Sequence, residues 1–148
     1  MSSSQPGRDP ESGGQGPPDK EFDARVDTIE EAYEFFLAYA SQGLPSDHTS
    51  ATGQQIRQFL QRCDTALTGL DDFILAFVDH AGLDVAPYRA FAAVIERDAR
   101  DASAAIQLVL SLPAIGSQVI DNLNASIHLR ALLTDLFLID EVLKTASR

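Results

Sequence analysis

The chain has only one cysteine, Cys63, and no unbroken apolar run of the roughly 18 residues that a helix needs to cross a membrane. A single cysteine excludes a disulfide framework within the chain, which is typical of proteins in a reducing compartment. The start of the sequence also lacks the basic segment followed by an apolar one that marks a secretory signal. We therefore predict a cytoplasmic protein with no membrane association.

Basic residues are scarce as well. The 148 residues include 11 Lys and Arg against 22 Asp and Glu, which gives a formal net charge of −11 at pH 7. A surface with this charge repels the phosphates of nucleic acids and of anionic lipids. Nucleic acids and membrane surfaces are therefore not expected as partners.

The sequence has no recognisable catalytic or cofactor-binding motif. The glycine-rich segment 13–16 lacks the lysine, strand and helix of a phosphate-binding loop. No Glu-x-x-His sequence, the signature of a di-metal site in a helical bundle, occurs anywhere in the chain. We predict that the protein is not an enzyme and that it holds no cofactor and no metal.

The composition divides the chain into two parts. Residues 1–25 are rich in Ser, Gly, Pro and Gln and have almost no apolar surface to offset the entropy of ordering, so we predict a disordered tail. Residues 26–148 show helical periodicity and are long enough to bury a core of their own. The predicted fold is all-α, an antiparallel four-helix bundle, because short loops join neighbouring helices.

The first predicted helix is short. It begins near Thr28, since Thr28 and Glu31 have the spacing of a capping box, and it ends at Gly43, which a hydrophobic residue follows. At about 22 Å, this helix spans half of the next one, which the periodicity predicts to be continuous over residues 52–81. Part of the longer helices is therefore expected to lie uncovered.

Residues 52–81 carry apolar residues at positions a, d and e of a heptad over about eight turns. A helix with so wide an apolar stripe is stable only when other helices cover it. The stripe consists of Ile56, Cys63, Leu70 and Phe77 at a, Phe59, Ala66, Phe73 and His80 at d, and Leu60, Leu67, Ile74 and Ala81 at e. We expect a core centred on Phe59, Leu70, Phe73, Phe77, Ile95, Ile106, Leu132 and Leu136.

Two further helices are predicted. One runs from Pro87 to Leu112, and the other runs from Ser117 to the end of the sequence. Placed at 100° intervals, the residues of the last helix form two apolar faces. One face holds Leu129, Leu132, Leu133, Leu136, Ile139 and Leu143, and the second holds Ile127, Ala131, Leu138 and Val142. Such a helix is either central in its bundle or covered by a partner.

Four polar residues on or beside these apolar faces are the candidates for a chemical site. In the last turn of its helix, His80 is expected to be a partly buried histidine favoured by the helix dipole. His128 and Asp135 lie two turns apart on the last helix, about 10 Å along its axis. Asp98 joins them if the last two helices align. Such a group forms a structural polar network, a layer that fixes helix register, or a metal or acid–base site.

These features predict a non-enzymatic protein-interaction module, such as an assembly factor, adaptor or regulator, that acts as a homodimer. The second apolar face of the last helix is the expected interface, because an isolated chain would expose it. The alternative is a small-molecule or metal-binding helical bundle built around His128 and Asp135. A third class, an acidic decoy for a nucleic-acid-binding protein, is supported by the charge alone.

Overall fold

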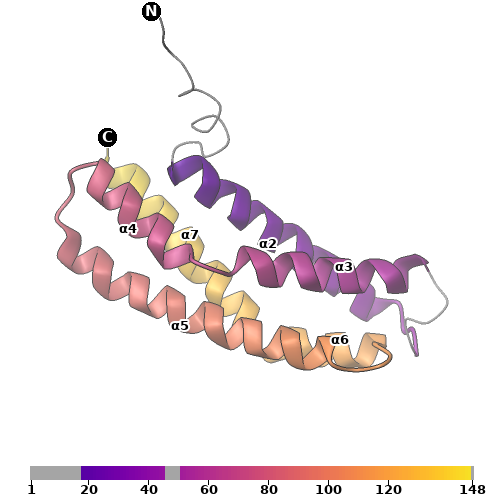
Figure 1. Ribbon diagram of the computed structural model, residues 1–148. Coiled ribbons are helices and arrows are strands. Elements are labelled where there is room, and N and C mark those ends of the chain that lie inside the picture. The colour runs from indigo at the N-terminus through magenta and orange to yellow at the C-terminus, as the bar shows by residue number, and fades with distance from the viewer. Residues whose placement is uncertain (1–17, 46–50, 148) are drawn as a thin grey trace, which may run out of the picture.

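The computed structural model describes residues 18–45 and 51–147, which form six α-helices and no strand (Figure 1). In chain order the helices are α2 (Pro18–Ser41), α3 (Ala51–Ala66), α4 (Leu70–His80), α5 (Val85–Leu110), α6 (Ser117–Ala125) and α7 (His128–Ala146). The expectation of an all-helical fold is confirmed for this part of the chain. The count differs from the expected four because two of the predicted helices are interrupted.

The helices alternate in direction along the molecule. α2 runs away from the end where the C-terminus lies, α3 and α4 run back, α5 runs out again, and α6 and α7 return (Figure 1). α2 packs against α3, α4 and α6, while α5 packs against α4 and α7. With 24 residues, α2 thus contacts both halves of the predicted long helix. The expectation that a short first helix leaves part of it uncovered is wrong.

α2 begins at Pro18, about ten residues before its predicted start. Thr28 does not cap a helix, because its hydroxyl donates to the carbonyl oxygen of Ala24 at 3.0 Å in the middle of α2. Phe22 is only 5% exposed and supplies the apolar burial that holds the first turns. α2 thus begins before the predicted tail boundary at residue 25, and residues 1–17 of that tail lie outside the described residues.

The predicted helix over residues 52–81 is interrupted between α3 and α4. Gly69 has a φ of 77°, in the left-handed region that glycine adopts without strain, and is the N-cap of α4. Arg25 of α2 supplies a hydrogen-bond donor to the carbonyl groups at the end of α3. Its Nη1 donates to the carbonyl oxygens of Thr65 at 3.2 Å and Thr68 at 2.8 Å. Its guanidinium carbon also lies 4.8 Å from the centre of the Phe73 ring. A third helix thus holds this junction together.

Near the end of the predicted stripe, the buried residues differ from those that the heptad pattern predicts. Positions a and e are buried through most of the stripe, but Val78 is buried where the heptad predicts Phe77. The phenylalanines at d, Phe59 and Phe73, are only partly buried. His80 is exposed, as are the residues on either side of it, so the prediction of a partly buried histidine is wrong. The other expected core residues are buried: Leu70, Ile95, Ile106, Leu132 and Leu136.

α5 agrees with its predicted bounds to within two residues at each end. Its N-cap is Asp84, whose Oδ1 accepts a hydrogen bond from the backbone nitrogen of Ala86 at 3.4 Å. The predicted last helix, in contrast, is interrupted between α6 and α7. Ile127 at this break has a φ of 61°, and it is the one non-glycine residue with a positive φ in the described part of the chain.

A group of hydrogen bonds joins the end of α2 to the start of α6. Ser117 is 3% exposed, and its hydroxyl donates to the carbonyl oxygen of Tyr39 at 2.6 Å while accepting from the backbone nitrogen of Leu44 at 2.8 Å. The phenol of Tyr39 donates to the carbonyl oxygen of Ile115 at 2.6 Å. These contacts fix the position of α6, and of α7 after it, against α2.

Candidate functional site

The two apolar faces predicted for the last helix are clearly distinguished in α7. The inner face is buried throughout and consists of Leu129, Leu132, Leu133, Leu136, Ile139 and Leu143. On the second face, Ile127 is 57% exposed, Leu138 is 54% exposed and Val142 is 38% exposed, while Ala131 is partly buried. We call these four residues the outer strip. The described helices of the chain leave it open.

Ile127, the first residue of the outer strip, has an unfavourable backbone conformation. Its φ of 61° and ψ of 1° place a β-branched residue in the left-handed region, at a cost on the order of 1–3 kcal/mol. Glycine and asparagine tolerate this conformation far better. Because more than half of the side chain is exposed, burial within the chain does little to offset the cost.

A shallow hollow of about 330 Å³ opens at the N-terminal end of the outer strip. On the helix circumference, Arg130 and Asp135 flank this hollow from opposite edges. Its lining residues are Ile127, Arg130, Ala131, Thr134 and Asp135. The site therefore combines an apolar floor with charges of both signs at its rim.

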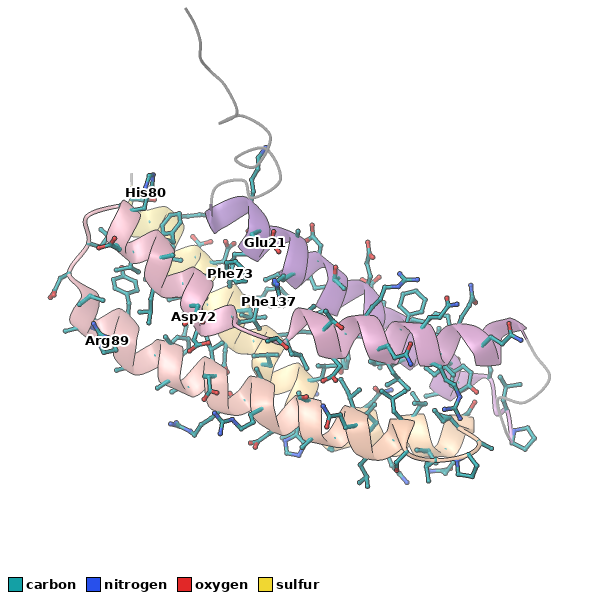
Figure 2. All side chains as sticks on the ribbon, in the orientation of Figure 1. Glu21, Asp72, Phe73, His80, Arg89 and Phe137 are labelled. Carbon is teal, nitrogen blue, oxygen red and sulfur yellow. The ribbon has the colours of Figure 1, made fainter. Side chains whose placement is uncertain are left out.

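Phe137 is a large exposed side chain on α7 that the sequence reasoning missed (Figure 2). It is 50% exposed. At 100° per residue it falls on the polar edge formed by Arg130, Thr134 and Glu141, not on either apolar face. Its aromatic ring among polar neighbours was the one signal in the sequence that could have identified it. Phe137 widens the apolar surface next to the outer strip.

Asp98 of α5 and Asp135 of α7 form an acidic pair beside the outer strip. Burial, together with the neighbouring Asp98 carboxyl, raises the pKa of Asp135 to about 7. The Oδ2 atom of Asp135 is buried and has no hydrogen-bond partner within the described residues. Of the predicted group of three, Asp98 and Asp135 thus come together, whereas His128 is exposed and lies outside the pair. Near neutral pH, a proton on Asp135 relieves the repulsion between the two carboxyl groups.

The structure leaves the two candidate histidines outside this pair. His128 is exposed in the first turn of α7, and His80 is exposed at the outer end of α4 (Figure 2). No group of three or more His, Cys, Asp or Glu residues in the described ranges could hold a metal ion. The structure thus brings Asp98 and Asp135 together but places neither histidine beside them.

A separate small cavity lies between the start of α2, α4 and the end of α7. Its volume of about 200 Å³ is below the roughly 300–1,000 Å³ typical of ligand pockets. Phe22, Phe73 and Phe77 line it, and the ion pair between Lys144 and Asp140, 2.9 Å long, lies at its rim. These contacts fit the packing of helix ends better than a binding pocket.

None of the helices in the described part combines the length and apolar character needed to cross a membrane. Comparison of the chain with protein-family models, with curated proteins and with solved structures finds no match.

Proposed function

We propose that this protein is a non-enzymatic protein-interaction module that forms a homodimer through the outer strip of α7. The observation that carries the proposal is Ile127, which combines an exposed apolar side chain with a backbone conformation that disfavours isoleucine. In an isolated chain, the exposed side chain of Ile127 contributes little stabilising burial. Covering its side chain with a second copy provides the burial that offsets the backbone cost.

The proposed architecture is an antiparallel four-helix bundle in which two of the four helices are interrupted. Its support is the alternating direction of α2, of α3 with α4, of α5, and of α6 with α7 (Figure 1). In such a bundle each helix buries one apolar stripe against the others. The second apolar face of a helix then stays exposed and is available to a partner. The proposed cytoplasmic location is supported by the single cysteine, and the net charge of −11 makes nucleic acids poor partners.

The alternative of a small-molecule or metal-binding bundle has less support. It needs His128 and Asp135 to act together, but His128 is exposed and Asp135 pairs with Asp98 instead. The acidic pair is consistent with a structural contact between α5 and α7.

Sedimentation equilibrium of wild-type protein and of two matched variants tests the homodimer. Leu138→Asp places a charge in the outer strip, so we expect it to weaken a dimer that forms at micromolar concentration, with helical content largely kept. Leu108→Asp is the control, because Leu108 on α5 is even more exposed, at 72%, and lies outside the strip. Wild-type protein that stays monomeric, or equal weakening by both variants, would overturn the proposal.

A second variant separates loss of association from loss of folding. Ile127→Gly relieves the left-handed backbone while removing the exposed side chain. We expect thermal stability at least equal to that of the wild type, measured at a concentration where the protein is monomeric, together with weaker association. Unchanged association would show that Ile127 is not part of the interface.

A further inference from the structure

The outer strip is symmetric about its own middle. Ala131 and Leu138 lie equally far from the midpoint of residues 134–135, and so do Ile127 and Val142. If two copies of α7 pack antiparallel about a two-fold axis through this midpoint, each small Ala131 faces a large Leu138 of the second copy. Ile127 and Val142 then face each other at both ends of the contact. The strip is therefore complementary to itself in one orientation.

The charges along one edge of the strip favour the same orientation. Arg130 and Glu141 are eleven residues apart, which places them within about 20° of each other around the helix. Both are exposed, and neither forms an ion pair within residues 18–45 and 51–147. In the antiparallel pair, the same edges of the two copies meet. Arg130 of one copy then lies only about 3 Å along the axis from Glu141 of the other.

A parallel arrangement lacks this complementarity. Around a two-fold axis parallel to the helices, opposite edges of α7 meet. On the edge that then faces Arg130, the residue of the second copy nearest in height is His128. On the edge that faces Glu141, it is the apolar Val142. No opposite charge lies at either level, and Asp135, the acidic residue on the edge that Arg130 then meets, is about 7–8 Å further along the axis.

We propose that two copies of this chain pair their α7 helices antiparallel about a two-fold axis between Thr134 and Asp135, with Arg130 of each copy bound to Glu141 of the other. This inference rests on the homodimer proposed above and specifies its geometry. The strip is about 22 Å long, which makes a contact smaller than a standard protein interface. The expected dissociation constant is accordingly micromolar.

Cysteine cross-linking distinguishes the two orientations. Thr134 and Thr145 are both exposed and lie on the same side of α7. In the antiparallel pair, the two copies of residue 134 lie within about 2 Å of each other along the axis, whereas those of residue 145 are about 32 Å apart. The native Cys63 does not compete, because it is buried and burial raises its pKa to about 12.

We expect Thr134→Cys to form a covalent dimer on oxidation or with a short thiol cross-linker, and Thr145→Cys to stay uncross-linked. Cross-linking of both variants would show a parallel pair and overturn the proposed geometry while leaving the homodimer intact. Cross-linking of neither, with wild-type protein dimeric, would place the interface elsewhere and overturn the geometry too. A monomeric wild type would overturn the homodimer itself.

Charge reversal tests the Arg130 to Glu141 contact directly. Each of Arg130→Glu and Glu141→Arg should raise the dissociation constant about three- to tenfold, because like charges then face each other across the axis. The double variant restores opposite charges and should bind within about twofold of the wild type. Additive weakening in the double variant, with all three variants folded, would overturn the proposed pairing.

Discussion

Replacing Ser117 by alanine should lower the free energy of unfolding by about 2–3 kcal/mol. The hydroxyl is the acceptor for the backbone N–H of Leu44, and leaving this partly buried donor unpaired costs about 1–2 kcal/mol. Loss of the bond from the hydroxyl to the carbonyl oxygen of Tyr39 adds about 1 kcal/mol. This second contribution stays small because the same carbonyl also accepts from the backbone nitrogen of Gln42 at 3.1 Å.

Urea unfolding followed by circular dichroism measures this loss, with Ser111→Ala as the control. Ser111 is exposed, and its hydroxyl bonds only to the carbonyl oxygen of Leu108 one turn away. Its replacement should change the stability by no more than about 0.5 kcal/mol. A loss below about 1 kcal/mol for Ser117→Ala, or equal losses in both variants, would show that water satisfies Leu44 and would refute the reasoning.

Three other substitutions test other parts of the fold. Phe22→Ala should cost about 2–4 kcal/mol in urea unfolding, as expected for a buried phenylalanine, and a cost under about 1 kcal/mol would show that the start of α2 does not pack on the core. Asp135→Asn should raise the melting temperature by about 2–4 °C more at about pH 8 than at about pH 5. Burial and Asp98 raise the pKa of Asp135 to about 7, so its stabilising contribution is fully present below about pH 4 and is lost as the pH rises through 7. Equal shifts at both pH values would contradict this assignment. Gly116→Ala should cost about 1–3 kcal/mol, because the new Cβ would lie 2.7 Å from the carbonyl oxygen of Pro45, and an unchanged melting temperature would exclude so close a contact.

Hydrophobic periodicity predicted the parts of the fold that depend on one helix and its apolar face. The buried inner face of α7 and the bounds of α5 follow from the spacing of apolar residues and from local end signals. The interruption at Gly69 could not be read from periodicity, since Leu67 before it and Leu70 after it are both buried and keep the stripe in phase. Thr68-Gly69 was the only local signal of a break.

Two other features depend on contacts between distant segments. The first turns of α2 were assigned to a tail because composition averages over many residues, whereas a single aromatic, Phe22, decides the packing there. No glycine or proline in the sequence indicates the interruption at Ile127. The position of α6 before it depends in part on the hydrogen bonds of Ser117 to the distant end of α2. Such breaks are determined by tertiary packing, which a single sequence does not reveal.

Three residues of the outer strip could be predicted because Ala131, Leu138 and Val142 follow the helical repeat of α7, whereas Ile127 is exposed at the break before this helix. The 100° spacing identified Ile127, Ala131, Leu138 and Val142 as one face, and the structure leaves that face open. The acidic pair could not be predicted from the helical repeat alone, because whether Asp98 meets Asp135 depends on how α5 packs against α7. Phe137 was missed because its neighbours on the helix surface are polar.

The burial of Cys63 makes opening of the molecule measurable without an engineered probe. Its side chain is fully buried on α3, so a thiol reagent reaches it only in molecules whose core has opened. The chain has no other thiol, and each labelling event therefore reports the same site. When reclosing is faster than labelling, the labelling rate gives the free energy of that opening. A value below the global free energy of unfolding would mean that the packing of α3 against α2 and α5 opens ahead of the rest of the fold.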